Sequence, residues 1–170
     1  MAKRPKAQSY QEMLEKAAEA SMQEARMVLP GIQALFGFQL IATFSPGFYE
    51  LPTDERHLHF AAVVLVTLSI AMIMAPTAYH RIVEQGSVSL FFVRLISLMI
   101  AAAMVPLMIA LCLDVYLIGA LVLSARWAAA VIAGALLLVF AALWFVFPFV
   151  VRSGRLLMTG APEPWRPPED

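Results

Sequence analysis

The chain has 170 residues, of which 61% are hydrophobic and only 14% charged, and its mean hydropathy is +0.78. A soluble domain with this composition would leave far too much apolar surface uncovered, which excludes a soluble globular protein. The formal net charge is zero, and no nucleic-acid partner is expected. The single cysteine, Cys112, excludes an intrachain disulfide and any multi-cysteine metal site.

Residues 1–26 form a polar tail that carries charges throughout. Apolar residues recur in it at helical spacing, which predicts an amphipathic helix on the cytoplasmic side of a membrane. We expect this helix to lie on the lipid headgroups or at the inner mouth of a helix bundle, with a dedicated partner-binding helix as the alternative. Pro30 and Gly31 then predict a kink or a break before the first apolar stretch.

Four apolar stretches contain no Asp, Glu, Lys or Arg, namely residues 27–44, 58–79, 95–113 and 127–151. Each approaches or exceeds the roughly 20 residues that a helix needs to cross a bilayer. The sequence therefore predicts an all-α protein, a four-helix transmembrane bundle over residues 27–151. The predicted spans are residues 27–46, 58–80, 90–114 and 127–151.

Two segments lie outside these spans. Residues 115–124 are mostly apolar but too few to cross a bilayer, so they either extend the third helix outward or form an interfacial turn. Residues 152–170 are predicted to be a cytoplasmic tail, and four prolines in its last ten residues favour disorder there.

The distribution of Lys and Arg predicts the orientation. Ten of these residues lie in the two tails and the second connection, whereas only Arg56 and Arg126 lie in the first and third connections. By the positive-inside rule, both termini are cytoplasmic and the acidic first connection lies outside.

Polar side chains inside the spans are the candidates for function. The intramembrane candidates are Gln33, Gln39, Thr43, Arg94 and Asp114. An unpaired amide or hydroxyl is costly in lipid, so we expect such groups, with Thr67, Ser69 and Ser97, to face other helices or a water-filled gap. No charged residue lies at the centre of a span, and Asp114 at the end of the third is the only acid attached to one. The spans therefore predict no exchange of sodium for protons, which needs a group that binds both.

The second span ends in the densest polar cluster of the chain. Its members are Ser69, Pro76, Thr77, Tyr79, His80 and Arg81. Ser69, Pro76 and His80 share one face of a helix, and Pro76 frees a backbone carbonyl. The cluster is either an anchor in the headgroups or a functional site at the inner surface. We expect His80→Ala to reduce stability or activity more than the same change at His57 or His59.

The sequence predicts no metal, no cofactor and no catalytic residues. His59 and His80 are 21 residues apart, about 31 Å along one helix, so they cannot share an ion within one bundle. His57 and His59 beside Asp54 and Glu55 form only a weak divalent-metal pattern. The chain has no P-loop, no Rossmann glycine pattern and no Ser-His-Asp set, and it is not expected to be an enzyme.

Two sequence motifs carry a resemblance to a known family. They are VLPGIQALFGF at residues 28–38 and APTAYHR at residues 75–81, together with Arg94 and with Asp114, Val115 and Tyr116. These motifs resemble a family of small bacterial four-helix integral membrane proteins of unknown function, over about residues 24–147. Many members are named sodium:proton antiporter. The resemblance implies a multi-pass protein of the bacterial cytoplasmic membrane.

Two classes of function stay open. In the first, a homo-oligomer forms a small transport or channel-like protein around a pathway lined by Gln33, Gln39 and the freed backbone at Pro76. In the second, the chain is a structural or accessory subunit that packs against partner membrane subunits. The spacing of Ala129 with Ala133, and of Ala130 with Gly134, lets helices approach closely, either there or within the bundle. The lipid bilayer is a partner in both classes.

Overall fold

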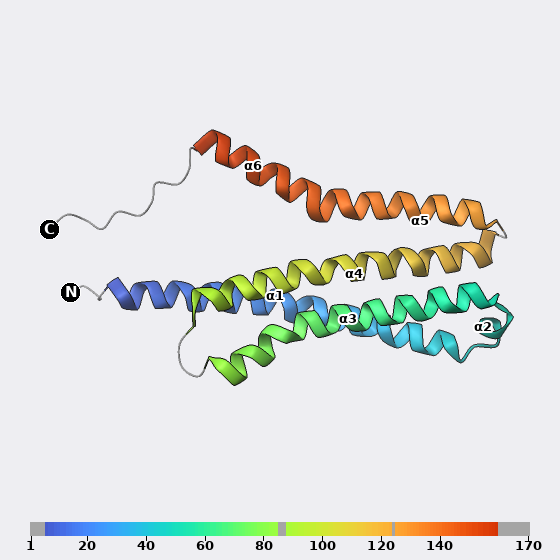
Figure 1. Ribbon diagram of the computed structural model, residues 1–170, viewed down its shortest axis with the longest axis horizontal. Helices are drawn as coiled ribbons and strands as arrows, with labels where there is room; N and C mark the ends of the chain where they lie inside the picture. Colours follow the sequence, from blue (N-terminus) through green and yellow to red (C-terminus); the bar gives the residue numbers. More distant parts are fainter. Residues whose placement is uncertain (1–5, 85–87, 124, 160–170) are drawn as a thin grey trace.

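A computed structural model of the protein describes residues 6–84, 88–123 and 125–159, with side chains over residues 10–154 of these ranges (Figure 1). The described part of the chain is almost entirely helical and has no strand. Its elements are α1 (Lys6–Thr43), α2 (Pro46–Glu50), α3 (Thr53–Val83), α4 (Leu90–Leu123), α5 (Arg126–Ala141), a π-helical turn (Ala142–Val146) and α6 (Phe147–Thr159). Four helices are long and apolar enough to cross a membrane, which confirms the predicted all-α bundle.

The long helices run alternately up and down (Figure 1). The start of α1, the end of α3, the start of α4 and the end of α6 lie at one end of the bundle, here called the terminal end. The short helix α2, the end of α4 and the start of α5 lie at the other, here called the α2 end. Helix α4 is central, because it packs against α1, α3 and α5.

The N-terminal helix and the first span form one continuous helix, α1, which passes through Pro30 without a break. Near its start Leu14 and Ala18 are buried, and Ala18 packs with Phe92 and Ile96. The N-terminal segment therefore lies at the mouth of the bundle, which was one of the two expected positions. Residues 1–5 and 160–170, the latter including the Pro-rich part of the predicted tail, lie outside the described residues.

Buried residues follow a seven-residue repeat along the helices. On α3 the buried positions are Glu55, His59, Ala62, Val66, Ser69, Ile73 and Pro76, with alternating spacings of four and three. On α4 the same spacing links Ala103, Leu107, Ala110 and Leu117, while the buried Pro106, Met108 and Cys112 lie outside it, because α4 packs against three helices. This spacing is typical of helices that pack nearly parallel, because it keeps one narrow stripe facing the neighbouring helix.

Helix α4 begins at a capped N-terminus. The Ser89 hydroxyl accepts a hydrogen bond from the backbone N–H of Phe92 at 3.0 Å, and Glu84 accepts hydrogen bonds from the N–H and the hydroxyl of Ser89. Such bonds satisfy donors that a helix N-terminus leaves free. At its other end α4 continues through residues 115–123, so this segment extends the third helix and is not an interfacial turn.

The fourth span, formed by α5, the π-helical turn and α6, packs mainly against α4. Ala129 and Ala133 are buried in that contact. A Cβ atom placed on Gly119 would lie 3.0 Å from the Cβ of Ala129, so the absence of a side chain allows α4 and α5 to approach closely. The small-residue face of Ala129 and Ala133 is therefore used for packing within the bundle, whereas Ala130 and Gly134 remain exposed.

Candidate binding site

Gln39, His59 and Asp114 come together near the α2 end of the bundle. The side-chain Nε2 of Gln39 on α1 donates a hydrogen bond to Oδ2 of Asp114 on α4 at 2.8 Å. The Nε2 atom of His59 on α3 lies 3.0 Å from the backbone oxygen of Gln39. Because that oxygen can only accept, His59 must carry its proton on Nε2. Three helices thus contribute to one polar cluster, here called the Gln39 cluster.

The seven-residue repeat explains why these three side chains meet. Gln39 follows Ala18 and Ile32 at multiples of seven on α1, and both of those residues are buried. His59 lies on the buried stripe of α3. Asp114 lies four residues after Ala110 and three before Leu117, which are both buried on α4. The stripes that pack the helices together therefore carry these polar side chains inward.

The Gln39 cluster has unused hydrogen-bond acceptors. Gln39 is only 4% exposed, yet its Oε1 atom has no hydrogen-bond partner. Among the described residues, no Lys or Arg forms an ion pair with Asp114, whose only hydrogen bond comes from Gln39. A buried polar atom without a partner is costly, so the arrangement is suited to a molecule that donates hydrogen bonds.

A cavity of about 300 Å³ opens beside the Gln39 cluster. Helices α1 to α4 all contribute to its wall. Its polar lining comes from Gln39, Ser45, His59 and Asp114, and the other lining residues are apolar or glycine. Mainly apolar walls with a few polar groups are typical of sites for small organic molecules. The apolar sequence around Asp114 gave no indication of this cavity.

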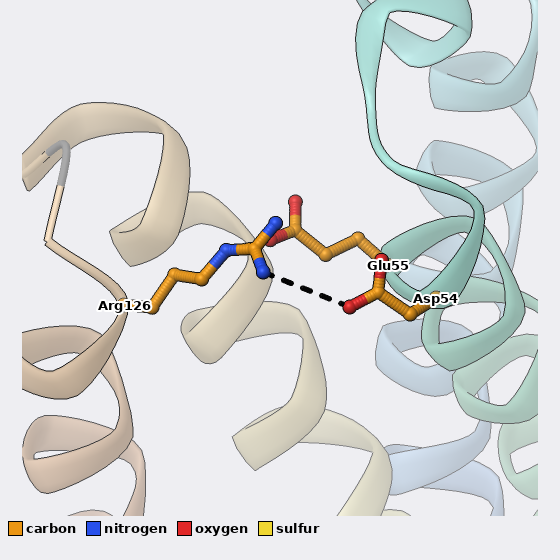
Figure 2. A network of polar contacts seen from close by, with 3 residues as sticks. All are labelled: Asp54, Glu55 and Arg126. Carbon is orange, nitrogen blue, oxygen red and sulfur yellow. Dashed lines mark ion pairs between the residues drawn. The ribbon is translucent and has the colours of Figure 1, made fainter.

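An ion pair joins α3 to α5 close to the Gln39 cluster. Nε of Arg126 lies 3.0 Å from Oε1 of Glu55, whose side chain is only 5% exposed, and Nη1 of Arg126 lies 3.8 Å from Oδ2 of the exposed Asp54. Figure 2 shows the guanidinium of Arg126 extending from its helix toward both carboxylates. Glu55 is one helical turn before His59 on the same buried stripe, so this ion pair lies next to the Gln39 cluster in the fold.

The predicted cluster at the end of the second span lies toward the terminal end, away from the cavity. Tyr79 stacks on Phe92 with ring centroids 5.9 Å apart, and the ring of His80 lies 5.1 Å from the same phenylalanine. Ser69 and Pro76 are buried, and the hydroxyl of Ser69 donates to the backbone oxygen of Leu65 at 3.0 Å. The remaining members, Thr77 and Arg81, are exposed.

Only some of the predicted intramembrane candidates lie together in the structure. Gln39 and Asp114 belong to the Gln39 cluster, whereas Gln33 and Arg94 are exposed. Gln33 does not line the cavity, and neither does Pro76, so the pathway predicted from Gln33, Gln39 and Pro76 is not found there. The hydroxyl of Thr43 donates to a backbone oxygen of its own helix.

Hydroxyls elsewhere in the spans also bond locally. Thr67 and Ser97 are exposed, and each donates to the backbone oxygen four residues earlier. Such a local bond satisfies a hydroxyl in lipid without a second helix. Whether these two residues face a helix of another subunit or a water-filled gap stays a prediction.

In the sequence, His59 and Glu55 belong only to a weak metal pattern with His57 and Asp54. In the structure His57 is exposed while Glu55 and His59 are buried. The described residues contain no group of three His, Cys, Asp or Glu side chains that could hold a metal ion. The seven-residue repeat was the sequence signal that could have placed His59 beside Gln39.

Comparison with known proteins gives a family but no function. No curated protein and no solved structure matches the chain. A family model described as "Family of unknown function (DUF6328)" matches residues 7–148, which include the first three spans, most of the fourth and all three residues of the Gln39 cluster. The chain therefore belongs to this family of unknown function.

Proposed function

We propose that this membrane protein is a small transport protein that acts as a homo-oligomer and contacts its solute through the Gln39 cluster. The observation that supports this proposal is a cavity of about 300 Å³ whose lining residues include the acid Asp114 and Gln39, a glutamine with a buried, unpartnered amide oxygen. Assembly is part of the proposal because one four-helix bundle is small for a solute path.

The free-energy cost of the Gln39 cluster favours a binding role over a purely structural one. The rest of the cavity wall is almost entirely apolar, and an acidic group near a membrane interior is unfavourable unless it is paired. The hydrogen bond from Gln39 satisfies only one oxygen of Asp114. A solute that supplies further donors would complete the site.

Transport is tested with protein reconstituted in liposomes on a solid-supported membrane. Jumps in the concentration of inorganic and organic cations should evoke a current with at least one solute. The current should be lost in Asp114→Asn and retained in Glu50→Gln, a matched change at an exposed acid of α2. Currents absent for every solute, from a protein that is monomeric in mild detergent, would contradict the proposal.

We also propose that both termini are cytoplasmic and that the α2 end faces outward, in the cytoplasmic membrane of a bacterium. The bias of ten basic residues to two supports this orientation. On a background without Cys112, a cysteine at position 54 should react with an impermeant reagent in intact cells. Cysteines at positions 6 and 155 should react only after permeabilisation. Labelling of position 6 in intact cells would reverse the orientation.

A second candidate function is that of an accessory subunit in a larger membrane complex. The fourth span supports it, since its most apolar stretch contains no buried residue and Val131, Leu138 and Val139 are exposed. This face is open to lipid or to another protein. Purification in mild detergent at native expression level distinguishes the candidates: a stoichiometric heterologous membrane subunit supports the accessory role, and a homo-oligomer supports transport.

A further inference from the structure

We infer that the cavity beside the Gln39 cluster binds an amphiphilic amine, a small molecule with an apolar body and a protonated nitrogen. The inference rests on the proposed function in taking the cavity as a solute site, and it adds the chemical class of the solute. Three observations support it: the unpartnered acceptor on a lining residue, the lack of a Lys or Arg partner for Asp114 among the described residues, and the apolar wall.

The unpartnered polar atom on a cavity-lining residue is a buried acceptor. Oε1 of Gln39 has no partner, and the Nε2 donor of the same amide already bonds to Asp114. The Nε2 donor of His59 is directed to the backbone oxygen of Gln39. A ligand with N–H groups would satisfy such an acceptor, whereas a carboxylate or phosphate would be repelled by Asp114 and would find only the second N–H of the Gln39 amide as a donor in the Gln39 cluster.

Charge also favours a cation. Arg126 forms ion pairs with Glu55 and Asp54 and not with Asp114. Among the described residues, the neighbouring basic group that interacts with Asp114 is the imidazole of His59, and no Lys or Arg pairs with it, so a ligand ammonium would supply a fully charged partner. Phe38 and Phe48 line the same cavity, and aromatic faces attract ammonium groups.

The lining residues and the volume of the cavity indicate the polarity and the size of the ligand's body. Leu35, Leu51, Leu117 and Ile118 are among the lining residues, so a hydrated inorganic cation would leave most of the wall without a matching surface. A protein cavity of about 150 Å³ accommodates benzene. The volume of about 300 Å³ is roughly twice that, which fits a bicyclic aromatic or a branched aliphatic group.

The test uses 1-naphthylmethylamine, with 1-naphthalenemethanol and 1-naphthoate as probes that share its body but differ in charge. Binding is measured by isothermal titration calorimetry on the full chain in phosphatidylcholine nanodiscs, after subtraction of empty discs. We expect saturable binding of the amine, at least tenfold tighter than of the alcohol, and no binding of the naphthoate.

Two variants act on different parts of the site. Asp114→Asn removes the charge and should weaken amine binding at least tenfold while leaving the alcohol nearly unchanged. Ala42→Phe, at an exposed position in the cavity wall, should exclude both ligands. The controls Glu50→Gln and Ala101→Phe, at exposed positions outside the cavity, should bind like the parent protein.

Equal amine binding by all five proteins would indicate partition into lipid and overturn the inference, as would naphthoate binding as tight as that of the amine. Loss of amine binding when phosphatidylethanolamine replaces phosphatidylcholine would identify a lipid headgroup as the occupant, and would also overturn it. Amine binding without any transport current would contradict the proposed function alone. A current that depends on Asp114, in a protein that binds no amine, would contradict only the present inference.

Discussion

Gln39 and Asp114 are 75 residues apart in the sequence, yet Nε2 of the first donates to Oδ2 of the second at 2.8 Å and joins α1 to α4. Helix α3 packs against α4 more extensively than α1 does, and this bond adds a polar link between the first span and the centre of the bundle. Its contribution can be measured directly.

We predict that Gln39→Leu and Asp114→Leu are coupled in stability. Interhelical hydrogen bonds in membranes contribute on average about 0.6 kcal/mol and at most about 1.7 kcal/mol, so a double-mutant cycle should give a coupling energy in that range. The measurement is reversible unfolding in mixed micelles. Strictly additive effects of the two substitutions would show that the bond contributes nothing to stability.

The Glu55–Arg126 ion pair should respond unequally to loss of its two members. Glu55 is almost fully buried, whereas the side chain of Arg126 is 56% exposed and has Asp54 as a second partner. Arg126→Met would leave a buried carboxylate unpaired and should cost about 1–2 kcal/mol, less than for a fully buried pair because water reaches the guanidinium. Glu55→Gln should cost less, since Arg126 can be solvated.

The measurement for this ion pair is thermal unfolding in detergent. Asp54→Asn is the control, and it should change stability little because Asp54 is exposed and 3.8 Å from Arg126. A larger loss from Glu55→Gln than from Arg126→Met would contradict the asymmetry.

Hydropathy alone predicted the four helices, because an apolar stretch of spanning length in lipid satisfies its backbone hydrogen bonds internally as a helix. The candidate site was only half predicted. Gln39 and Asp114 were candidates, but nothing in the local sequence indicated that they bond to each other or that a cavity lies beside them. Gln33 and Gln39 are both glutamines in the same apolar stretch. Only the position of Gln33 outside the seven-residue repeat distinguishes the two. Mean hydropathy does not resolve which face of a helix a side chain occupies.

The order expected for the three histidines changes with the structure. His59 is buried and bonded to Gln39, His80 is half-buried against the ring of Phe92, and His57 is exposed. His59→Ala should therefore be the most destabilising, His80→Ala intermediate, and His57→Ala within about 0.5 kcal/mol of the parent protein. Thermal unfolding of the three variants in one detergent tests this order. A loss at His80 larger than at His59 would restore the order predicted from sequence.

Gly119 and Gly134 provide a matched pair for the α4–α5 contact. A Cβ atom at Gly119 would lie 3.0 Å from that of Ala129, whereas at Gly134 it would meet no atom within 4 Å. Gly119→Leu should separate the helices and destabilise the protein by about 1–3 kcal/mol, the usual cost of overpacking. Gly134→Leu should leave the monomer fold intact. Equal stability of both variants in mixed micelles would contradict this account of the contact.

The last prediction concerns sodium. Transporter sites for sodium commonly use backbone oxygens of unwound helices, but α1, α3 and α4 are continuous at Gln39, His59 and Asp114, so their backbone oxygens are engaged in helical hydrogen bonds. The side chains of Asp114 and Gln39 alone supply few oxygens in an otherwise apolar cavity. We therefore expect that protein in liposomes will not dissipate a pH gradient when sodium is added, as reported by an internal pH dye.

This sodium test could contradict the prediction, because the cavity provides the opening beside Asp114 that an ion would require. Potassium and choline serve as controls for a leak, and Glu50→Gln as the control for loss of an exposed acid. A sodium-specific signal that disappears in Asp114→Asn and persists in Glu50→Gln would defeat the prediction. It would make Asp114 the ion-coupling residue and would require water in the cavity to complete the coordination of sodium.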